Sequence, residues 1–227
     1  MRLTSNAVVE NSRFNGRSAQ AWAGTILVDG GARGVQVTNC TLVPNTSNWS
    51  IPEEAGGAIW KHGNSGLLVS NCNLHANLPN QITFQGGFLD VRYSNVEDGW
   101  PGEGNISDGV LYRDQLGPDG IKGTIDDDLS LRGPSPCADS RNNALAPAGL
   151  LTDLAGNPRF ADSPRFVDSP AAPDLGAPGG VGRGVLVDMG CYEFQPSTAC
   201  LGDINGDGRV DGADLGIILG AWGLCSE

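Results

Sequence analysis

The sequence is poor in charged residues, aromatic residues and histidine. Charged residues make up 18% of its 227 residues, aromatic residues make up 6%, and there are two histidines. The formal net charge of −12 provides no basic surface, so we expect neither nucleic acid nor an anionic membrane as a partner. Two histidines are too few for a histidine-based metal site, and no apolar run is long enough to span a membrane.

A secretory signal is also missing from the start of the chain. Met1 is followed directly by polar, strand-like sequence, without the apolar segment of a signal peptide. Six cysteines are present, an even number that permits disulfides outside the cell, and none has the spacing of a zinc site. We expect a monomeric, C-terminal part of a longer secreted or cell-surface chain whose targeting segment is not included.

The sequence is rich in glycine and proline and contains an internal repeat. Its 34 glycines and 14 prolines suit a turn-rich β architecture. A six-residue pattern recurs, with apolar ends, a small residue at position four and asparagine or, in the last copy, tyrosine at position three. A spacing of about 20–35 residues with no helical period predicts a solenoid. The copies are residues 9–14, 37–42, 69–74 and 91–96.

The repeat also predicts where each coil turns. Its two apolar ends are five positions apart, and simple alternation would place them on opposite faces of a strand. A corner at the asparagine returns both to the interior, so Asn11, Asn39 and Asn71 should stack and join their amides in a ladder. Cys40 and Cys72 should then be stacked neighbours, and we favour two small core residues over a disulfide.

These repeats resemble the right-handed parallel β-helix proteins of secreted bacterial surface and carbohydrate-active families. The resemblance covers about residues 1–110. It implies an all-β chain with a right-handed β-helix, followed by a loop-rich cap over residues 111–196 and a small C-terminal unit over residues 200–227.

The middle segment carries three further motifs in order. They lie after Gly99–Asn105 and resemble the end of a choice-of-anchor Q β-helix protein, where the solenoid stops before a surface-anchoring module. We expect the segment to lie over the last coil and block its edge, with Cys137 and Cys191 as a candidate bridge. Three adjacent aspartates, 126–128, are interpreted as a solvated acidic loop rather than a second cation site. The motifs are residues 135–139, 152–160 and 187–194.

The segment 203–214 has the ligand spacing of a calcium-binding loop. Oxygen-bearing side chains occupy loop positions one, three, five, nine and twelve, and Gly208 occupies position six, where such a loop turns sharply. The apolar run 215–222 is predicted to be the exiting helix. A calcium site also suits an extracellular protein, because calcium is plentiful there. The side chains are those of Asp203, Asn205, Asp207, Asp211 and Asp214.

This segment resembles one repeat of a type I dockerin. The resemblance implies Ca²⁺ bound by those five side chains and by the Arg209 carbonyl at position seven, and a cohesin-like or cell-surface anchoring partner. A full dockerin has two repeats, whereas this chain has one, which suits an anchoring tag. Cys200 and Cys225 flank the unit, and a bridge between them would stabilise a segment that is too short for its own core.

No catalytic or cofactor-binding residues are predicted. Asp29, Asp90, Glu97 and Asp98 are interpreted as turn residues, and no nucleophile motif occurs. The leading hypothesis is a non-catalytic extracellular β-helix protein with a calcium-dependent anchoring unit. One alternative is the end of a polysaccharide lyase or glycoside hydrolase whose active coils precede Met1. The other is a carbohydrate-binding module that contacts polysaccharide, with Trp49, Trp60 and Trp100 as candidates for sugar stacking and Trp60 favoured as core.

Overall fold

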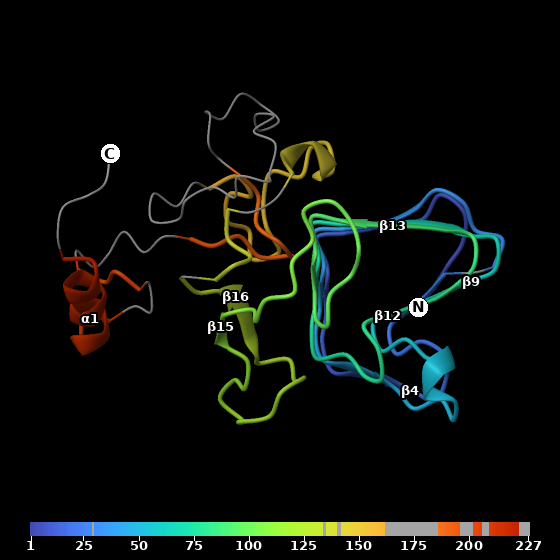
Figure 1. Cartoon of the computed structure of the whole chain (residues 1–227), viewed down its shortest axis with the longest axis horizontal. Helices are drawn as coiled ribbons and strands as arrows, with labels where there is room; N and C mark the ends of the chain where they lie inside the picture. The colour runs from blue at the N-terminus through green and yellow to red at the C-terminus, as the bar shows by residue number, and fades with distance from the viewer. Residues whose placement is uncertain are drawn as a thin grey trace.

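In a computed structural model of the chain, the regular structure consists mostly of parallel β-strands. The structure describes residues 1–28, 30–133, 135–139, 142–161, 186–195, 202–205 and 209–222. Three four-stranded sheets are parallel throughout, and the described helices are short (Figure 1). The prediction of an all-β chain is therefore confirmed at this level.

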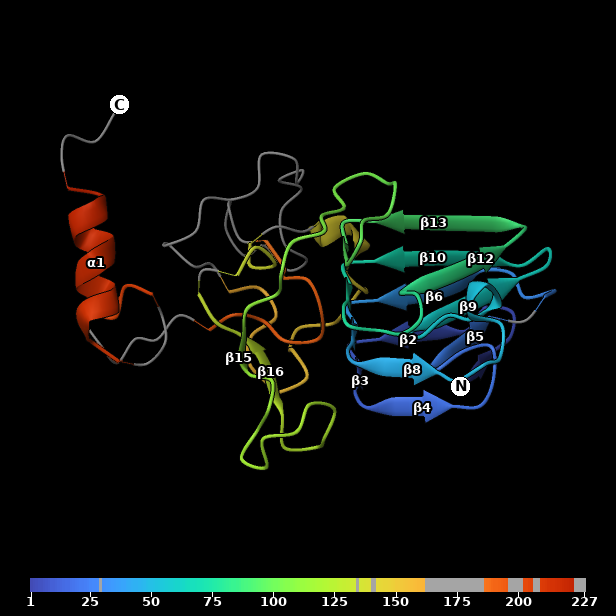
Figure 2. The ribbon, with the colours of Figure 1, turned by 60° about the horizontal axis from the view of Figure 1, so that its bottom comes forward.

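Each repeat contributes one strand to each of three sheets. The first sheet contains β1 (Arg2–Leu3), β5 (Ile26–Val28), β9 (Ile59–His62) and β12 (Ile82–Gln85). The second contains β2 (Val8–Glu10), β6 (Val35–Thr38), β10 (Gly66–Ser70) and β13 (Phe88–Arg92). The third contains β3 (Arg13–Phe14), β7 (Thr41–Leu42), β11 (Asn73–Leu74) and β14 (Asn95–Val96). The strands of the second sheet are stacked in chain order in Figure 2.

The remaining elements are short. β4 (Arg17–Ala19) pairs with β8 (Asn45–Ser47) in parallel, and the turn η1 (Pro52–Glu54) follows β8. β15 (Tyr112–Asp114) and β16 (Asp128–Leu131) form an antiparallel hairpin with an irregular register. The turn η2 (Asn143–Leu145) lies in the middle segment, and α1 (Gly212–Gly220) is the C-terminal helix.

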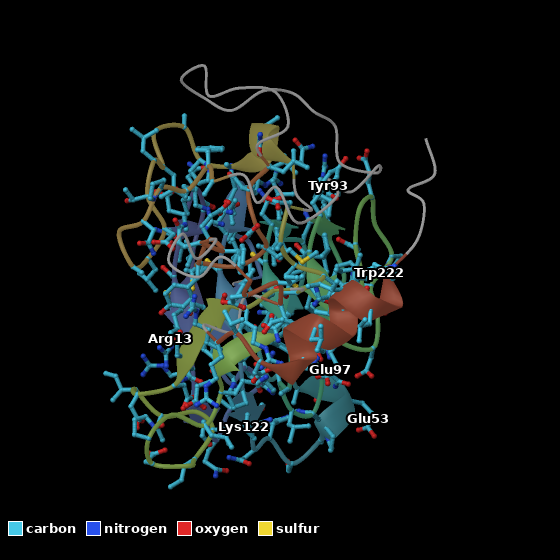
Figure 3. The ribbon with its side chains drawn as sticks, turned by 90° about the vertical axis from the view of Figure 1, so that its left-hand side faces the viewer. Arg13, Glu53, Tyr93, Glu97, Lys122 and Trp222 are labelled. Atoms are coloured by element: carbon cyan, nitrogen blue, oxygen red, sulfur yellow. The ribbon has the colours of Figure 1, made fainter. Side chains whose placement is uncertain are left out.

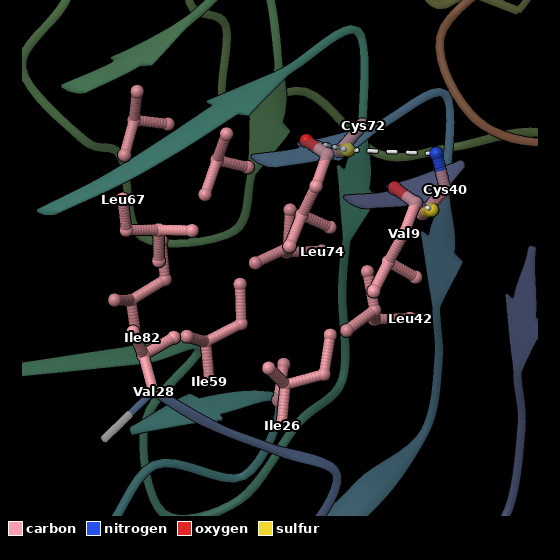
Figure 4. Packing of buried hydrophobic residues seen from close by; sticks show 14 of the residues in the cluster. Val9, Ile26, Val28, Cys40, Leu42, Ile59, Leu67, Cys72, Leu74 and Ile82 are labelled. Carbon is pink, nitrogen blue, oxygen red and sulfur yellow. Dashed lines mark hydrogen bonds between the residues drawn. The ribbon is translucent and has the colours of Figure 1, made fainter. Parts of the chain in front are cut away.

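The register follows the sequence repeat. Val9 pairs with Val37, Val37 with Val69, and Val69 with Val91. The other apolar end of the repeat forms a second row, Phe14, Leu42, Leu74 and Val96. Both rows line one core, which Figure 4 shows together with the isoleucines of the first sheet. Burying the apolar ends on one side therefore sets which residues pair between coils.

The corners lie where the repeat predicts them, but the amide ladder does not form. Asn11, Asn39 and Asn71 have φ of 46°, 51° and 51°, the left-handed conformation that asparagine tolerates. In this conformation the Asn11 and Asn71 amides reach the middle segment instead of each other, donating to the carbonyls of Thr152 and Asn142 at 3.3 and 3.2 Å. The amide of Asn45 instead donates to that of Asn77 across adjacent coils, at 2.8 Å.

The described part of the middle segment lies beside the coils rather than over the last one. We call residues 1–110 the coils and the described residues of 111–161 and 186–195 the cap. The Arg13 guanidinium donates to Asp127 O, Cys191 N donates to Thr41 Oγ1, and Asn73 Nδ2 donates to Met189 O. These contacts run from the first coil to the third, and both views place the cap to one side (Figures 1 and 2). The predicted position over the last coil was wrong.

A segment of the coils themselves covers their last turn. Tyr93 N donates to Glu103 O at 2.8 Å, and Val96 N donates to Ile106 O at 3.0 Å. Ile106 N in turn donates to Ser94 O at 3.0 Å. These bonds satisfy backbone groups at the edge of the fourth coil. The cap is therefore not needed to cover that edge, and it packs against the side of the coils instead.

Candidate functional site

The predicted calcium loop leads into α1 through a capping box. Asp211 is the N-cap residue, and its carboxylate accepts from Ala213 N at 2.8 Å. The Asp214 carboxylate accepts in return from Asp211 N at 2.8 Å. Loop positions nine and twelve therefore coincide with the N-cap and the third residue of the helix, so local helix capping places both carboxylates at the N-terminus of α1.

Asp214 also holds the start of the loop. Its Oδ1 accepts from Ile204 N at 2.7 Å and from Asn205 N at 3.1 Å, and its side chain is buried together with that of Asp203. The backbone N–H of Asp211, and then those of Asn205 and Ile204, lower the pKa of Asp214, while burial opposes them. The loop is thus closed onto a carboxylate that is charged at neutral pH.

The described part of the loop fits a cation only in part. Five of the six predicted ligands, all except Asp207, lie in described residues. Three N–H groups fill most of the about four acceptor positions of the Asp214 carboxylate. Within the described residues, no group of three or more His, Cys, Asp or Glu side chains is close enough to hold an ion. Calcium binding therefore stays a prediction.

The three cap motifs meet in a cluster of buried charged residues. Asp153 accepts from Asn157 N at 2.8 Å and from Glu193 N at 3.1 Å, which joins the second motif to the third. Asp188 accepts from Asp139 N at 2.7 Å, which joins the third motif to the first. The motifs recognised in the sequence are therefore parts of one structural unit, a role that their sequences alone did not indicate.

Arg159 and Glu193 form an ion pair inside this cluster. Both side chains are fully buried, and Nε of Arg159 lies 3.5 Å from Oε2 of Glu193. The guanidinium also donates to the carbonyls of Asp188 and Gly190 at 3.0 and 2.6 Å. Burial, helped by the Asp188 carboxylate, raises the pKa of Glu193 well above its usual range, and Arg159 offsets part of this shift. Such a pair specifies an arrangement more than it stabilises it.

The described cysteines are buried thiols, and no disulfide joins any two of them. Cys40 and Cys72 are stacked neighbours in the core, as predicted, with Cys40 N donating to Cys72 Sγ at 3.4 Å. The predicted bridge between Cys137 and Cys191 was wrong, because Cys137 Sγ instead donates to the Asn73 amide at 3.2 Å. Burial raises the pKa of Cys191 to about 12, so its thiol is unreactive. The second predicted bridge, Cys200–Cys225, lies outside the described residues.

The carboxylates of the coils are used in local contacts. Asp90 pairs with Arg92, and Glu97 accepts from Ala76 N at 2.6 Å and from the Gln81 amide at 2.8 Å. Asp98 occupies a turn with φ of 68°. Glu97 and Asp98 lie in the turn after β14, as predicted, whereas Asp90 lies within β13, so the turn prediction was wrong for that residue. Asp29 lies outside the described part of the chain.

Tryptophans gather against the outer side of the first sheet. Trp60 stacks on Trp22 with ring centres 5.0 Å apart, and Trp49 meets Trp22 edge-on at 5.3 Å. Trp60 is buried, as predicted, but by these rings rather than by the coil core, to which Trp100 contributes instead. Trp22, which sequence reasoning missed, is 42% exposed.

The acidic loop of the cap is tied to the first coil. Asp127 accepts from the Asn15 amide at 3.0 Å and from Gly123 N at 2.8 Å. The Arg13 guanidinium donates to the Thr124 carbonyl at 2.9 Å. Asp126 is hydrogen bonded to Thr124, so these carboxylates order the loop itself.

Comparison with protein-family models, with curated proteins and with solved structures found no match to this chain. Among the described residues, no helix is long and apolar enough to cross a membrane.

Proposed function

We propose that this chain is a non-catalytic extracellular or cell-surface protein, built on a right-handed parallel β-helix and attached to a partner by a C-terminal calcium-binding unit. The β-helix is supported by the order of the strands, because each repeat supplies one parallel strand to three sheets in turn. Right-handedness is the general preference of parallel crossover connections.

The capping arrangement of α1 is the observation that carries the calcium proposal. Asp203 and Asn205 at the start of the loop are drawn toward Asp214 by the bonds from Ile204 N and Asn205 N. Ca²⁺ would be held by the side chains of Asp203, Asn205, Asp207, Asp211 and Asp214 and by the Arg209 carbonyl. A hard cation bound by six or more oxygens would stabilise a unit that is too short to build a core.

Helix α1 is suited to docking because its apolar side chains are exposed. Leu215, Leu219 and Trp222 are 54%, 59% and 79% exposed, and Trp222 is labelled at the end of the helix in Figure 3. Apolar residues at this density on a short helix favour an interaction surface over a solvated one. A cohesin-like or cell-surface anchoring protein is the proposed partner, by the resemblance of the loop to a dockerin repeat.

The absence of catalysis is proposed because the coil carboxylates have structural partners. Glycan hydrolysis uses two carboxyl groups that face a common substrate. Asp90 is paired with Arg92 within β13, and Glu97 accepts from Ala76 and Gln81, so each carboxylate already has a structural partner. We infer that the coils are a scaffold for the cap and the calcium unit.

Calorimetric titration with CaCl₂ tests this function. The chain should bind calcium at one site with a dissociation constant of about 10 µM to 1 mM, the range expected outside the cell. Asp203→Ala should abolish binding, whereas Asp119→Ala, in the exposed acidic loop of the cap, should not change it. Identical titrations for the wild-type chain and Asp203→Ala would refute the calcium site.

A further inference from the structure

A polar cavity of about 380 Å³ lies between the β15–β16 hairpin and two turns of the cap. Its size falls within the range of small-molecule sites, about 300–1,000 Å³. Three segments that are distant in sequence contribute to it. Seven of its lining side chains are polar or aromatic: Arg113, Asp128, Ser130, Asn157, Tyr192, Glu193 and Gln195.

Strand alternation explains why one wall of the cavity is polar. In the hairpin, Tyr112, Leu129 and Leu131 are buried in the second hydrophobic cluster. The intervening residues therefore point away from that cluster, and Arg113 and Asp128 are exposed while Ser130 is half-buried. The outer face of the hairpin thus presents a guanidinium, a carboxylate and a hydroxyl side by side.

The buried charge cluster fixes the opposite wall. Asn157 is held by Asp153, which accepts from both its backbone and its side-chain N–H groups, at 2.8 and 3.3 Å. Gln195 donates to Pro158 O at 3.3 Å. Tyr192 is half-buried beside Glu193, whose own backbone is held by Asp153. The cavity is therefore preorganised by residues that cannot move without disturbing the cap.

The chemistry of the lining selects for a neutral ligand with many hydroxyl groups. A hydroxyl is both donor and acceptor, and the cavity offers donors on Arg113, acceptors on Asp128, and both on Asn157 and Gln195. The charges of Arg113 and Asp128 cancel, and the carboxyl group of Glu193 is paired with the buried Arg159, so neither an anion nor a cation is favoured. The Tyr192 ring supplies an apolar wall of the kind that packs on the C–H face of a sugar ring.

We propose that this cavity binds a pyranose unit of a neutral glycan. The site goes beyond the anchoring function and shares no residue with the calcium loop. A failure of glycan binding can therefore be distinguished from a failure of calcium binding, because Asp203→Ala should leave glycan affinity unchanged.

Calorimetric titration of the full chain with cellotetraose, mannotetraose, laminaritetraose and trigalacturonate tests the proposal. At least one neutral probe should bind with a dissociation constant of about 1 mM or tighter. Asp128→Ala and Gln195→Ala should each weaken binding by about tenfold, the factor that corresponds to one lost hydrogen bond to a ligand. Thermal melting establishes that each variant is folded. If Asp128→Ala does not fold, Gln195→Ala alone tests the cavity.

Trp22→Ala is the matched control, because Trp22 is the exposed member of the tryptophan cluster on the coils. This variant should bind the probe with unchanged affinity. Affinity lost in Trp22→Ala but kept in both cavity variants would move the site to the tryptophans and overturn the proposal. Failure of all neutral probes to bind, or tighter binding of trigalacturonate than of any neutral probe, would also overturn it.

Discussion

Replacing Asp153 by alanine should destabilise the cap without touching the coils. The carboxylate is 3% exposed and accepts from Glu193 N at 3.1 Å and Asn157 N at 2.8 Å. In the alanine variant these two N–H groups and the side-chain amide of Asn157, which donates at 3.3 Å, lose their acceptor. Glu193 is buried and cannot recruit water, whereas Asn157 is half-buried and can do so in part.

The magnitude follows from the cost of unsatisfied donors. A buried donor without a partner costs about 1–3 kcal/mol, so one buried donor on Glu193 and two on Asn157 that can reach water in part give a loss of about 2–4 kcal/mol. For a chain of this size, 1 kcal/mol corresponds to about 2–4 °C of melting temperature, so the cap transition should fall by about 4–16 °C. Differential scanning calorimetry measures this directly.

Two further variants make this prediction specific. Asp108→Ala removes an exposed carboxylate near the cap and should change the free energy of unfolding by no more than about 0.5 kcal/mol. Asp153→Asn keeps one acceptor oxygen and should fall between the alanine variant and the wild-type chain. If Asp153→Ala melts at the same temperature as Asp108→Ala, the carboxylate does not join the two motifs and the described role of the cluster is wrong.

Three other predictions follow from the same contacts. Burial raises the pKa of Glu193 above the unfolded value of about 4.3, so the folded state binds the proton more tightly, and stability should fall as the pH rises from the unfolded to the folded pKa. Glu193→Gln should remove this slope in urea unfolding measured across that pH range, and an unchanged slope would contradict the assignment. Asn71→Ala should cost about 2–3 kcal/mol, because it loses the bond to Asn142 O and places alanine at φ of 51°, whereas Asn71→Gly should cost less. Finally, the chain should release no sugar fragments from pectic, alginate or sulfated polysaccharides, and turnover that disappears in Asp90→Ala would refute the non-catalytic proposal.

The arrangement of the coils could be predicted because it depends on local pattern. Val37 and Leu42 are both buried, and only a corner between them permits this. The same requirement recurs in each repeat, so the pairing of Val9, Val37, Val69 and Val91 follows from sequence alone. The amide ladder was wrong because the sequence does not reveal that cap carbonyls would compete for Asn11 and Asn71.

The cap could not be predicted because its contacts are long-range. Arg159 and Glu193 lie in loop-like sequence, where charged residues are normally solvated. Their burial depends on three motifs that pack around them, and no periodic pattern in the sequence predicts this packing. The predicted Cys137–Cys191 bridge was wrong for the same reason, because the position of Cys137 also depends on long-range contacts. Its thiol donates to the Asn73 amide of the third coil instead of forming a disulfide.

The calcium loop could be predicted in part, unlike the cap and less completely than the coils. The apolar run 215–222 predicted the exiting helix, but α1 spans Gly212–Gly220 and begins three residues earlier, because the capping box at Asp211 and Asp214 starts it. Cation binding depends in addition on how the oxygen ligands, which come from both ends of the loop, converge on one point.

Hydrogen exchange with and without calcium tests the central claim most directly. Calcium should slow exchange at the amides of Ile204, Asn205 and Asp211, which donate to Asp214, and at the amides of α1. Adding a chelator should restore fast exchange there and leave the amides of β6 and β10 protected, because the coil core is far away in sequence and built from its own residues. Exchange that is identical in the two conditions throughout the chain would contradict the calcium unit, and loss of protection in β6 and β10 on chelation would contradict its independence from the coils.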